Sequence, residues 1–264
     1  CQTRWHDDDL TGRVLKGRKA GEEVISLPAL CEAPEENRSI GDALWPERYS
    51  REALLETKED VGTRSWIALY QQKPSDEDGG LIKKVWFPRY DPRKYSLANK
   101  KVNFFIDTAY TSEEKNDPTA GIAYVKEGAD YYVLEVSADW MEFNEQVKFT
   151  KDFSQRNGYT SLSIIRVEPK ATGKSIVQVM KAGTDLNIKE GVSPKESKVS
   201  RVNSVSGVLE GGRVFLPEGM EWVNNFLNEC AAFPNAAHDD QVDCLTGMIL
   251  NESSGKRGAR FANG

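Results

Sequence analysis

Near the middle of its length the chain reads Val102-Asn103-Phe104-Phe105-Ile106-Asp107, a nearly continuous apolar run that ends in a carboxylate. Such a run predicts a strand that is buried on both faces of a sheet. A second apolar run, 119–125, follows after a polar loop, so the two runs predict a hairpin at the centre of a mixed sheet. Asp107 then has two interpretations. It is either a rigidly held metal ligand at a strand tip or an ordinary residue that caps the strand and starts a turn.

The segments after this hairpin complete an α/β pattern. The fourth strand of the pattern ends, like the first, in an acid, Glu168. The order strand, strand, strand, helix, strand, helix is typical of an RNase H-like fold. The further strands are expected at 131–136 and 162–167, and the further helices at 142–156 and 174–181.

The loop after Glu168 contains Gly173-Lys174-Ser175, which invites comparison with a phosphate-binding loop. The pattern G-x-x-x-x-G-K-[ST] requires a glycine at the position of Glu168, so the pattern fails and no ATP site is predicted. We instead expect the first amides of the following helix, together with Lys170 or Lys174, to be available to a DNA phosphate.

The outer parts of the chain are predicted to be mostly helical. Residues 83–101 carry seven basic residues interleaved with aromatic ones, which indicates either a nucleic-acid face or a solvated linker. Residues 184–200 predict a mobile excursion or a hairpin. The other expected elements are helices at 7–16, 51–58, 66–72, 198–210, 222–233 and 240–250, and strands at 24–30 and 213–217.

Composition limits the class of protein. With 264 residues, 39% hydrophobic residues and six Trp, the chain can bury a core. Its formal charge of −6 argues against general electrostatic attachment to nucleic acid, although an acidic nuclease can gather basic residues around its site. No run approaches the roughly 20 apolar residues of a membrane span.

The two ends and the cysteines add further expectations. The chain has no signal-peptide segment and does not begin with Met, so we expect a fragment of a longer chain. The cysteines have neither a C-x-x-C spacing nor a neighbouring histidine cluster, so reduced intracellular thiols are favoured over a zinc site. They are Cys1, Cys31, Cys230 and Cys244.

The last predicted helix opens with His238-Asp239-Asp240-Gln241-Val242-Asp243. Asp243 lies three residues after Asp240 and four after Asp239, so these acids can share one helix face. Crowded anions repel, and the helix N-terminus offsets only about 0.3–1 kcal/mol per charge. A divalent cation would offset the rest. The alternative is that Asp239 caps the helix while the other two lie in its first turn.

Together, two strand tips (Asp107 and Glu168) and one helix start (Asp240 and Asp243) supply oxygen ligands from three elements. Such ligands suit Mg²⁺ or Mn²⁺, and two ions about 3.5–4 Å apart can hydrolyse a phosphodiester. Asp243 leans back toward the strand tips, Asp240 can reach the same ion or orient its water, and Asp239 is the better cap.

Several motifs resemble one family. The first strand end reads Asp107-Thr108-Ala109-Tyr110, with Asp117-Pro118-Thr119-Ala120 after the loop; Lys198-Val199-Ser200-Arg201 and the His238–Asp243 motif follow. With Thr3-Arg4-Trp5-His6 near the start, the chain resembles the large terminase subunit of tailed double-stranded DNA bacteriophages. The likeness is to its C-terminal nuclease domain with the tail end of the packaging ATPase domain.

The resemblance implies a resolvase-type, RNase H-like α/β fold, with a mixed central sheet flanked by helices. It implies an ATPase remnant at 1–35, a linker subdomain at 36–98, the nuclease domain at 99–252 and a disordered tail at 253–264. The activity implied is two-metal cleavage of concatemeric viral DNA with Mg²⁺ or Mn²⁺, and no ATPase activity is expected from this chain. The implied partners are double-stranded DNA, the portal protein and the small terminase subunit, in the host cell cytoplasm and without a membrane.

The resemblance also implies roles for individual residues. Asp107, Glu168 and an acid of the last motif, Asp243 with Asp240, would be catalytic metal ligands. The implied DNA contacts are Lys170, Lys174, Lys198 and Arg201. Two alternatives stay open: a non-catalytic module that docks DNA or the portal protein, and a resolvase or transposase nuclease with the same fold.

Overall fold

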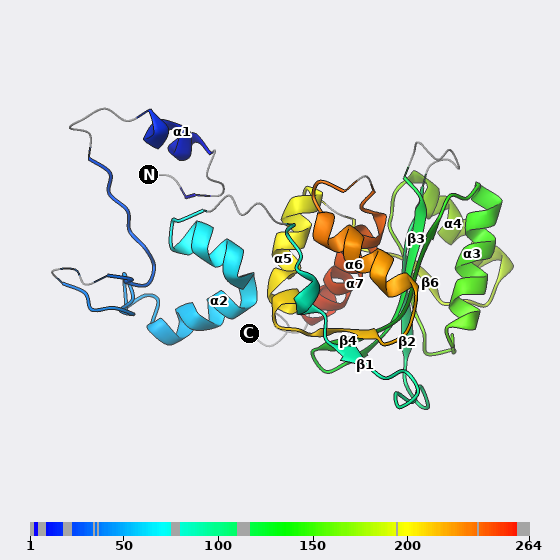
Figure 1. Cartoon of the computed structure of the whole chain (residues 1–264). Coiled ribbons are helices and arrows are strands. Elements are labelled where there is room, and N and C mark those ends of the chain that lie inside the picture. Colours follow the sequence, from blue (N-terminus) through cyan, green and yellow to red (C-terminus); the bar gives the residue numbers. More distant parts are fainter. Residues whose placement is uncertain are drawn as a thin grey trace. The chain divides into compact units, whose positions relative to one another are not determined.

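Among the residues that the structure describes, seven strands pair into one mixed sheet in the order β1-β7-β4-β3-β2-β5-β6 (Figure 1). Strand β3 is antiparallel to both of its neighbours, and the other neighbouring pairs are parallel. The strands are β1 Arg89–Tyr90, β2 Val102–Asp107, β3 Thr119–Glu127, β4 Asp130–Asp139, β5 Ile165–Val167, β6 Ile188–Glu190 and β7 Val214–Pro217.

The structure is a computed structural model that describes residues 3–4, 9–17, 23–33, 35, 37–74, 80–109, 117–193, 195–236 and 238–257. The chain divides into two units. The smaller unit comprises 1–79 and 203–211, and the larger comprises 80–202 and 212–264 and contains the whole sheet. No helix in the described part of the chain is both long and apolar enough to cross a membrane.

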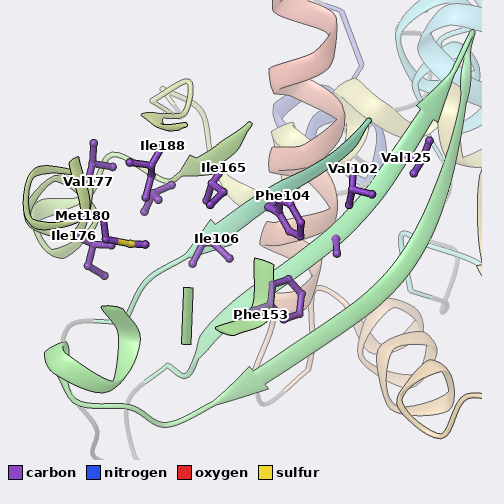
Figure 2. Packing of buried hydrophobic residues seen from close by; sticks show 12 residues of the cluster. Val102, Phe104, Ile106, Val125, Phe153, Ile165, Ile176, Val177, Met180 and Ile188 are labelled. Atoms are coloured by element: carbon purple, nitrogen blue, oxygen red, sulfur yellow. The ribbon is translucent and has the colours of Figure 1, made fainter. Parts of the chain in front are cut away.

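Strand β2 is buried along its full length, as its apolar run predicts. Phe104 and Ile106 face one layer of helices, α3 (Phe143–Arg156) and α4 (Ala171–Gly183), and pack there with Ile165 of β5. Figure 2 shows these side chains together with Phe153 of α3 in the same cluster. The cluster fixes the register of β2 and β5, and therefore the position of both strand ends.

The opposite face of β2 carries helix α7 (Asp240–Arg257). The ring of Phe105 lies against Gly247 so closely that a Cβ atom on this residue would be 2.3 Å from Phe105 Cζ. Glycine therefore lets α7 approach the strand. Helix α6 (Trp222–Ala232) packs beside α7 and against β4. The first turn of α7 is thereby held above the sheet.

The smaller unit contains α1 (Leu10–Lys16) and α2 (Arg51–Ser65), which continues into a π-helical turn, Trp66–Tyr70. Trp66 stacks on Tyr70 with ring centroids 4.9 Å apart, and it is buried with Ala43 and Leu54. Ser206 of helix α5 (Lys198–Glu210) donates a hydrogen bond to the carbonyl of Val61 at 2.8 Å. The second part of α5 belongs to this unit.

The α/β class and the mixed sheet flanked by helices are confirmed. The expected strand at 24–30 is wrong, because only Leu30 forms a bridge, to Ala43, and Pro28 lacks a donor. The expected helix at 66–72 is a continuation of α2. The hairpin considered for 184–200 is wrong, because β6 joins β5 in parallel.

Two expectations concern the chain ends. Helix α7 continues to Arg257, past the boundary at 252 where the sequence places a tail, and 258–264 lie outside the described residues. The expected helix at 7–16 begins at Leu10, capped by the side chain of Asp9, and positions 5–8 lie outside the described residues. The three described cysteines, Cys31, Cys230 and Cys244, are buried free thiols.

Candidate metal centre

Asp107 and Glu168 stand at neighbouring strand ends. Strands β2 and β5 are parallel, with Ile106 opposite Val167, so their carboxyl ends meet at one edge of the sheet. The ladder continues beyond β5, because the backbone amide of Glu168 donates to the carbonyl of Ile106 at 2.9 Å. Both acids are only 2% exposed. The structure thus brings these two acids together at the strand ends, and their role as ligands stays a prediction.

Helix α7 brings Asp243 to the same place from the other face of β2. Glu229 of α6 accepts hydrogen bonds from the amides of Gln241 at 2.8 Å and Val242 at 3.3 Å, which satisfies two free donors at the start of α7. Asp243 and Asp240 are 2% and 3% exposed. The start of this helix is thus fixed by packing, by Gly247 and by a carboxylate cap.

Three basic side chains lie among the acids. Lys170 Nζ is 3.1 Å from Asp107 Oδ1 and 2.5 Å from Glu168 Oε2. Arg201 bridges the two other elements, with Nη2 2.7 Å from Asp243 Oδ1 and Nη1 3.5 Å from Glu168 Oε1. These contacts connect Asp107, Glu168 and Asp243 into one charged cluster, which we call the carboxylate centre.

Lys198 completes the cluster from the start of α5. Its Nζ is 3.1 Å from Asp243 Oδ2 and also pairs with Asp239. Lys170, Lys198 and Arg201, which the sequence assigns to DNA, therefore contact acids in this structure. Lys174 is exposed on α4. The sequence predicts these four as phosphate contacts and gives no signal that three of them face the acids.

Burial controls the protonation of the centre. Loss of hydration raises the pKa of Asp107 well above its ordinary value, and the hydrogen bond to Glu168 adds to this rise. Burial also acts to raise the pKa of Glu168, but the hydrogen bond from Asp107 and the ion pair with Lys170 lower it overall. Asp107 and Glu168 thus share a proton when no metal is bound. A pair of crowded acids with this property is suited to exchange the proton for a cation.

Asp240 has a different set of neighbours. Burial raises its pKa to about 7, and the nearby charge of Asp117 contributes next. Asp117, His238 and Asp240 place one ligand atom each within 4.8 Å of one another. The sequence analysis quotes Asp117 and His238 only as parts of motifs and does not name them as site residues. Their proximity depends on the pairing of β3 with β2 and on the packing of α7, which no local pattern encodes.

The donor set of the carboxylate centre fits a hard divalent cation. Three carboxylates from three rigid elements supply oxygen ligands, which Mg²⁺ and Mn²⁺ prefer. The ammonium of Lys170 already lies between Asp107 and Glu168, so a positive charge is accommodated there. The residues that would hold the metal are therefore Asp107, Glu168 and Asp243.

The family comparison matches this part of the chain. Residues 105–252, more than half of the chain, match the model of the family described as Terminase RNaseH-like domain. The match includes all three acids of the carboxylate centre. No curated protein matches the sequence.

Solved structures with a similar fold are large terminases. That of a thermophilic bacteriophage in complex with ATP-gamma-S has 10% identity and a TM-score of 0.56, over 77% of this chain and 53% of that one. The same protein in complex with ADP has 11% identity and a TM-score of 0.55, over 77% and 52%. This chain therefore spans about half the length of those proteins. The large terminase nuclease of thermophilic phage G20c with bound magnesium has 13% identity and a TM-score of 0.47, over 66% and 98%.

Proposed function

This chain belongs to the terminase RNaseH-like domain family, and on that basis we propose that it is a divalent-metal-dependent endonuclease that hydrolyses double-stranded DNA. The observation that carries the proposal is the carboxylate centre. Asp107, Glu168 and Asp243 come from three elements and lie buried around basic side chains. Buried acids that converge from several elements, with displaced pKa values, are typical of metal-assisted hydrolytic sites.

In the proposed mechanism the three acids act as ligands. Two divalent ions, when bound, would supply an activated water and stabilise the leaving oxygen of the phosphodiester. Asp107 would serve both ions because its strand tip lies between the other two acids. Arg201, which is only 7% exposed, holds Glu168 and Asp243 in position and supplies a fixed positive charge.

Lys170 and Lys198 have two roles in this proposal. Without metal, they neutralise the acids. When cations enter, each lysine is free to turn toward solvent, where it can contact a DNA phosphate; the side chain of Lys170 is already 50% exposed. Lys174, exposed on the first turns of α4, adds a further contact.

The biological setting is part of the proposal. We place the chain in a viral packaging motor that cuts concatemeric DNA, with the portal protein and the small terminase subunit as partners in the host cell cytoplasm. The expected absence of ATPase activity rests on the lack of a phosphate loop after β5. Asp240 lies one turn before Asp243, and we treat it as a neighbour of the catalytic ions that faces a second group of ligands.

The test is cleavage of supercoiled plasmid. Nicked and linear products are expected with Mn²⁺ or Mg²⁺ and not with excess chelator. Glu168→Gln should abolish cleavage, whereas Glu190→Gln, a matched change at the exposed end of the neighbouring strand β6, should not. Activity in the presence of chelator would refute the metal mechanism. A wild-type protein that binds DNA without cutting it in any metal would favour the docking module.

A further inference from the structure

A second group of ligands lies beside the carboxylate centre. Asp117 precedes β3 by two residues, and His238 and Asp240 stand at the start of α7. One ligand atom from each residue lies within 4.8 Å of the others. In the described part of the chain this is the group of His, Cys, Asp and Glu side chains with such spacing.

Two buried atoms of this group have no hydrogen-bond partner among the described residues. Asp240 is 97% buried, being 3% exposed, and its Oδ2 atom is unpartnered. The Nδ1 atom of His238 is likewise buried and unpartnered. Buried polar atoms are nearly always satisfied in folded proteins, so an unpartnered carboxylate oxygen beside an unpartnered imidazole nitrogen indicates a ligand.

The surroundings of the group favour a positive charge. Asp117, Asp239 and Glu229 all act on Asp240 as like charges. Lys198 is the basic side chain named among its neighbours, and its ammonium pairs with Asp239 and Asp243. The edge of Trp140 packs on the ring of His238, with centroids 5.6 Å apart, and holds the imidazole in place.

We propose that Asp117, His238 and Asp240 bind a first-row transition-metal dication of the Mn²⁺ or Zn²⁺ kind, at a site separate from the carboxylate centre. Imidazole nitrogen suits these metals, whereas Mg²⁺ favours oxygen ligands and retains most of its water. Three protein ligands leave coordination positions for water or for a phosphate oxygen. The ion ties the segment before β3 to the start of α7, and this start carries Asp243.

Pulsed electron paramagnetic resonance can detect the imidazole ligand by the nitrogen coupling that it gives to bound Mn²⁺. The chain has two histidines, so the coupling can be assigned by mutation. Purified protein with one equivalent of Mn²⁺ is expected to show imidazole coupling. His238→Gln should lose it, and His6→Gln should retain it.

A second variant separates this site from the proposed nuclease. Asp107→Asn removes a ligand of the carboxylate centre, so it should abolish cleavage while the nitrogen-coupled Mn²⁺ remains. Asp117→Asn should weaken that ion at least tenfold in titration, whereas Asp152→Asn, an exposed acid on α3, should not. Circular dichroism checks that each variant folds.

The proposal is overturned if Mn²⁺ bound to wild type shows no nitrogen coupling, or if the coupling survives in His238→Gln. It is also overturned if Asp107→Asn loses the nitrogen-coupled ion, because a single shared site would then explain all binding. Failure of plasmid cleavage with the nitrogen signal intact would refute the nuclease alone.

Discussion

Removing the charge of Lys170 should strengthen metal binding by the protein without DNA. Lys170 Nζ is 3.1 Å from Asp107 Oδ1 and 2.5 Å from Glu168 Oε2, so it occupies space and charge that an ion needs. The substitution Lys170→Gln keeps the length of the side chain approximately and removes the ammonium. An incoming ion then no longer competes with a resident cation.

The size of the effect follows from electrostatics. Two unit charges about 4 Å apart interact by about 4 kcal/mol at an effective dielectric constant of about 20. The side chain of Lys170 is 50% exposed, so solvent screens it and reduces the competition to about 1–2 kcal/mol. This corresponds to a dissociation constant for Mn²⁺ lower by a factor of about 5–30.

Isothermal titration with Mn²⁺ measures the effect, and Lys174→Gln is the matched control because Lys174 lies on the same helix and is exposed. The control should bind Mn²⁺ like wild type, and both variants should bind DNA more weakly. Equal or weaker Mn²⁺ binding by Lys170→Gln would contradict this account, because Lys170 would then not compete for the carboxylate centre.

The remaining predictions concern stability, pH and salt. Asp243→Asn should abolish plasmid cleavage and, because it leaves buried Arg201 without its closest anion, lower stability by about 3–5 kcal/mol in urea unfolding. In chelator, Asp240→Asn should raise the melting temperature at pH 8 but not at pH 5: a folded pKa of about 7, above the unfolded 3.8, means that this acid stabilises the fold only while protonated, and the contribution is lost as pH rises. A Gly247→Ala change should cost about 1–3 kcal/mol in thermal denaturation, since its Cβ would meet the ring of Phe105. Cleavage should weaken steeply between about 50 and 200 mM salt, and a flat profile would contradict phosphate binding by a few lysines.

Local pattern was sufficient to predict the sheet and the meeting of two of the acids. A run buried on both faces, Val102–Asp107, has few alternatives to a central strand, and parallel neighbours place their carboxyl ends at one edge. The order of elements then brings Glu168 to Asp107. Short or unpartnered extended segments such as 24–30 carry the same local signal as a strand, because pairing depends on residues far away in sequence.

The partners of the acids could not be predicted in the same way. The sequence suggests that Asp239, Asp240 and Asp243 repel one another and that a cation relieves the repulsion. In the structure Lys198 pairs with Asp239 and Asp243, a contact that spans about forty residues and depends on how α5 meets α7. Long lysine and arginine side chains carry no periodic signal for their partner. Their charge is visible in the sequence, and its destination is not.

These contacts explain how an acidic chain can bind DNA at an acidic site. Asp107, Glu168 and Asp243 face Lys170, Lys198 and Arg201, so the centre is close to neutral without metal. Each divalent ion that enters adds two positive charges while the basic side chains remain nearby. The centre then becomes positive and attracts phosphate, although the chain as a whole has a formal charge of −6. Metal binding and DNA binding are therefore expected to strengthen each other, because each ion makes the place where the phosphodiester must lie more positive.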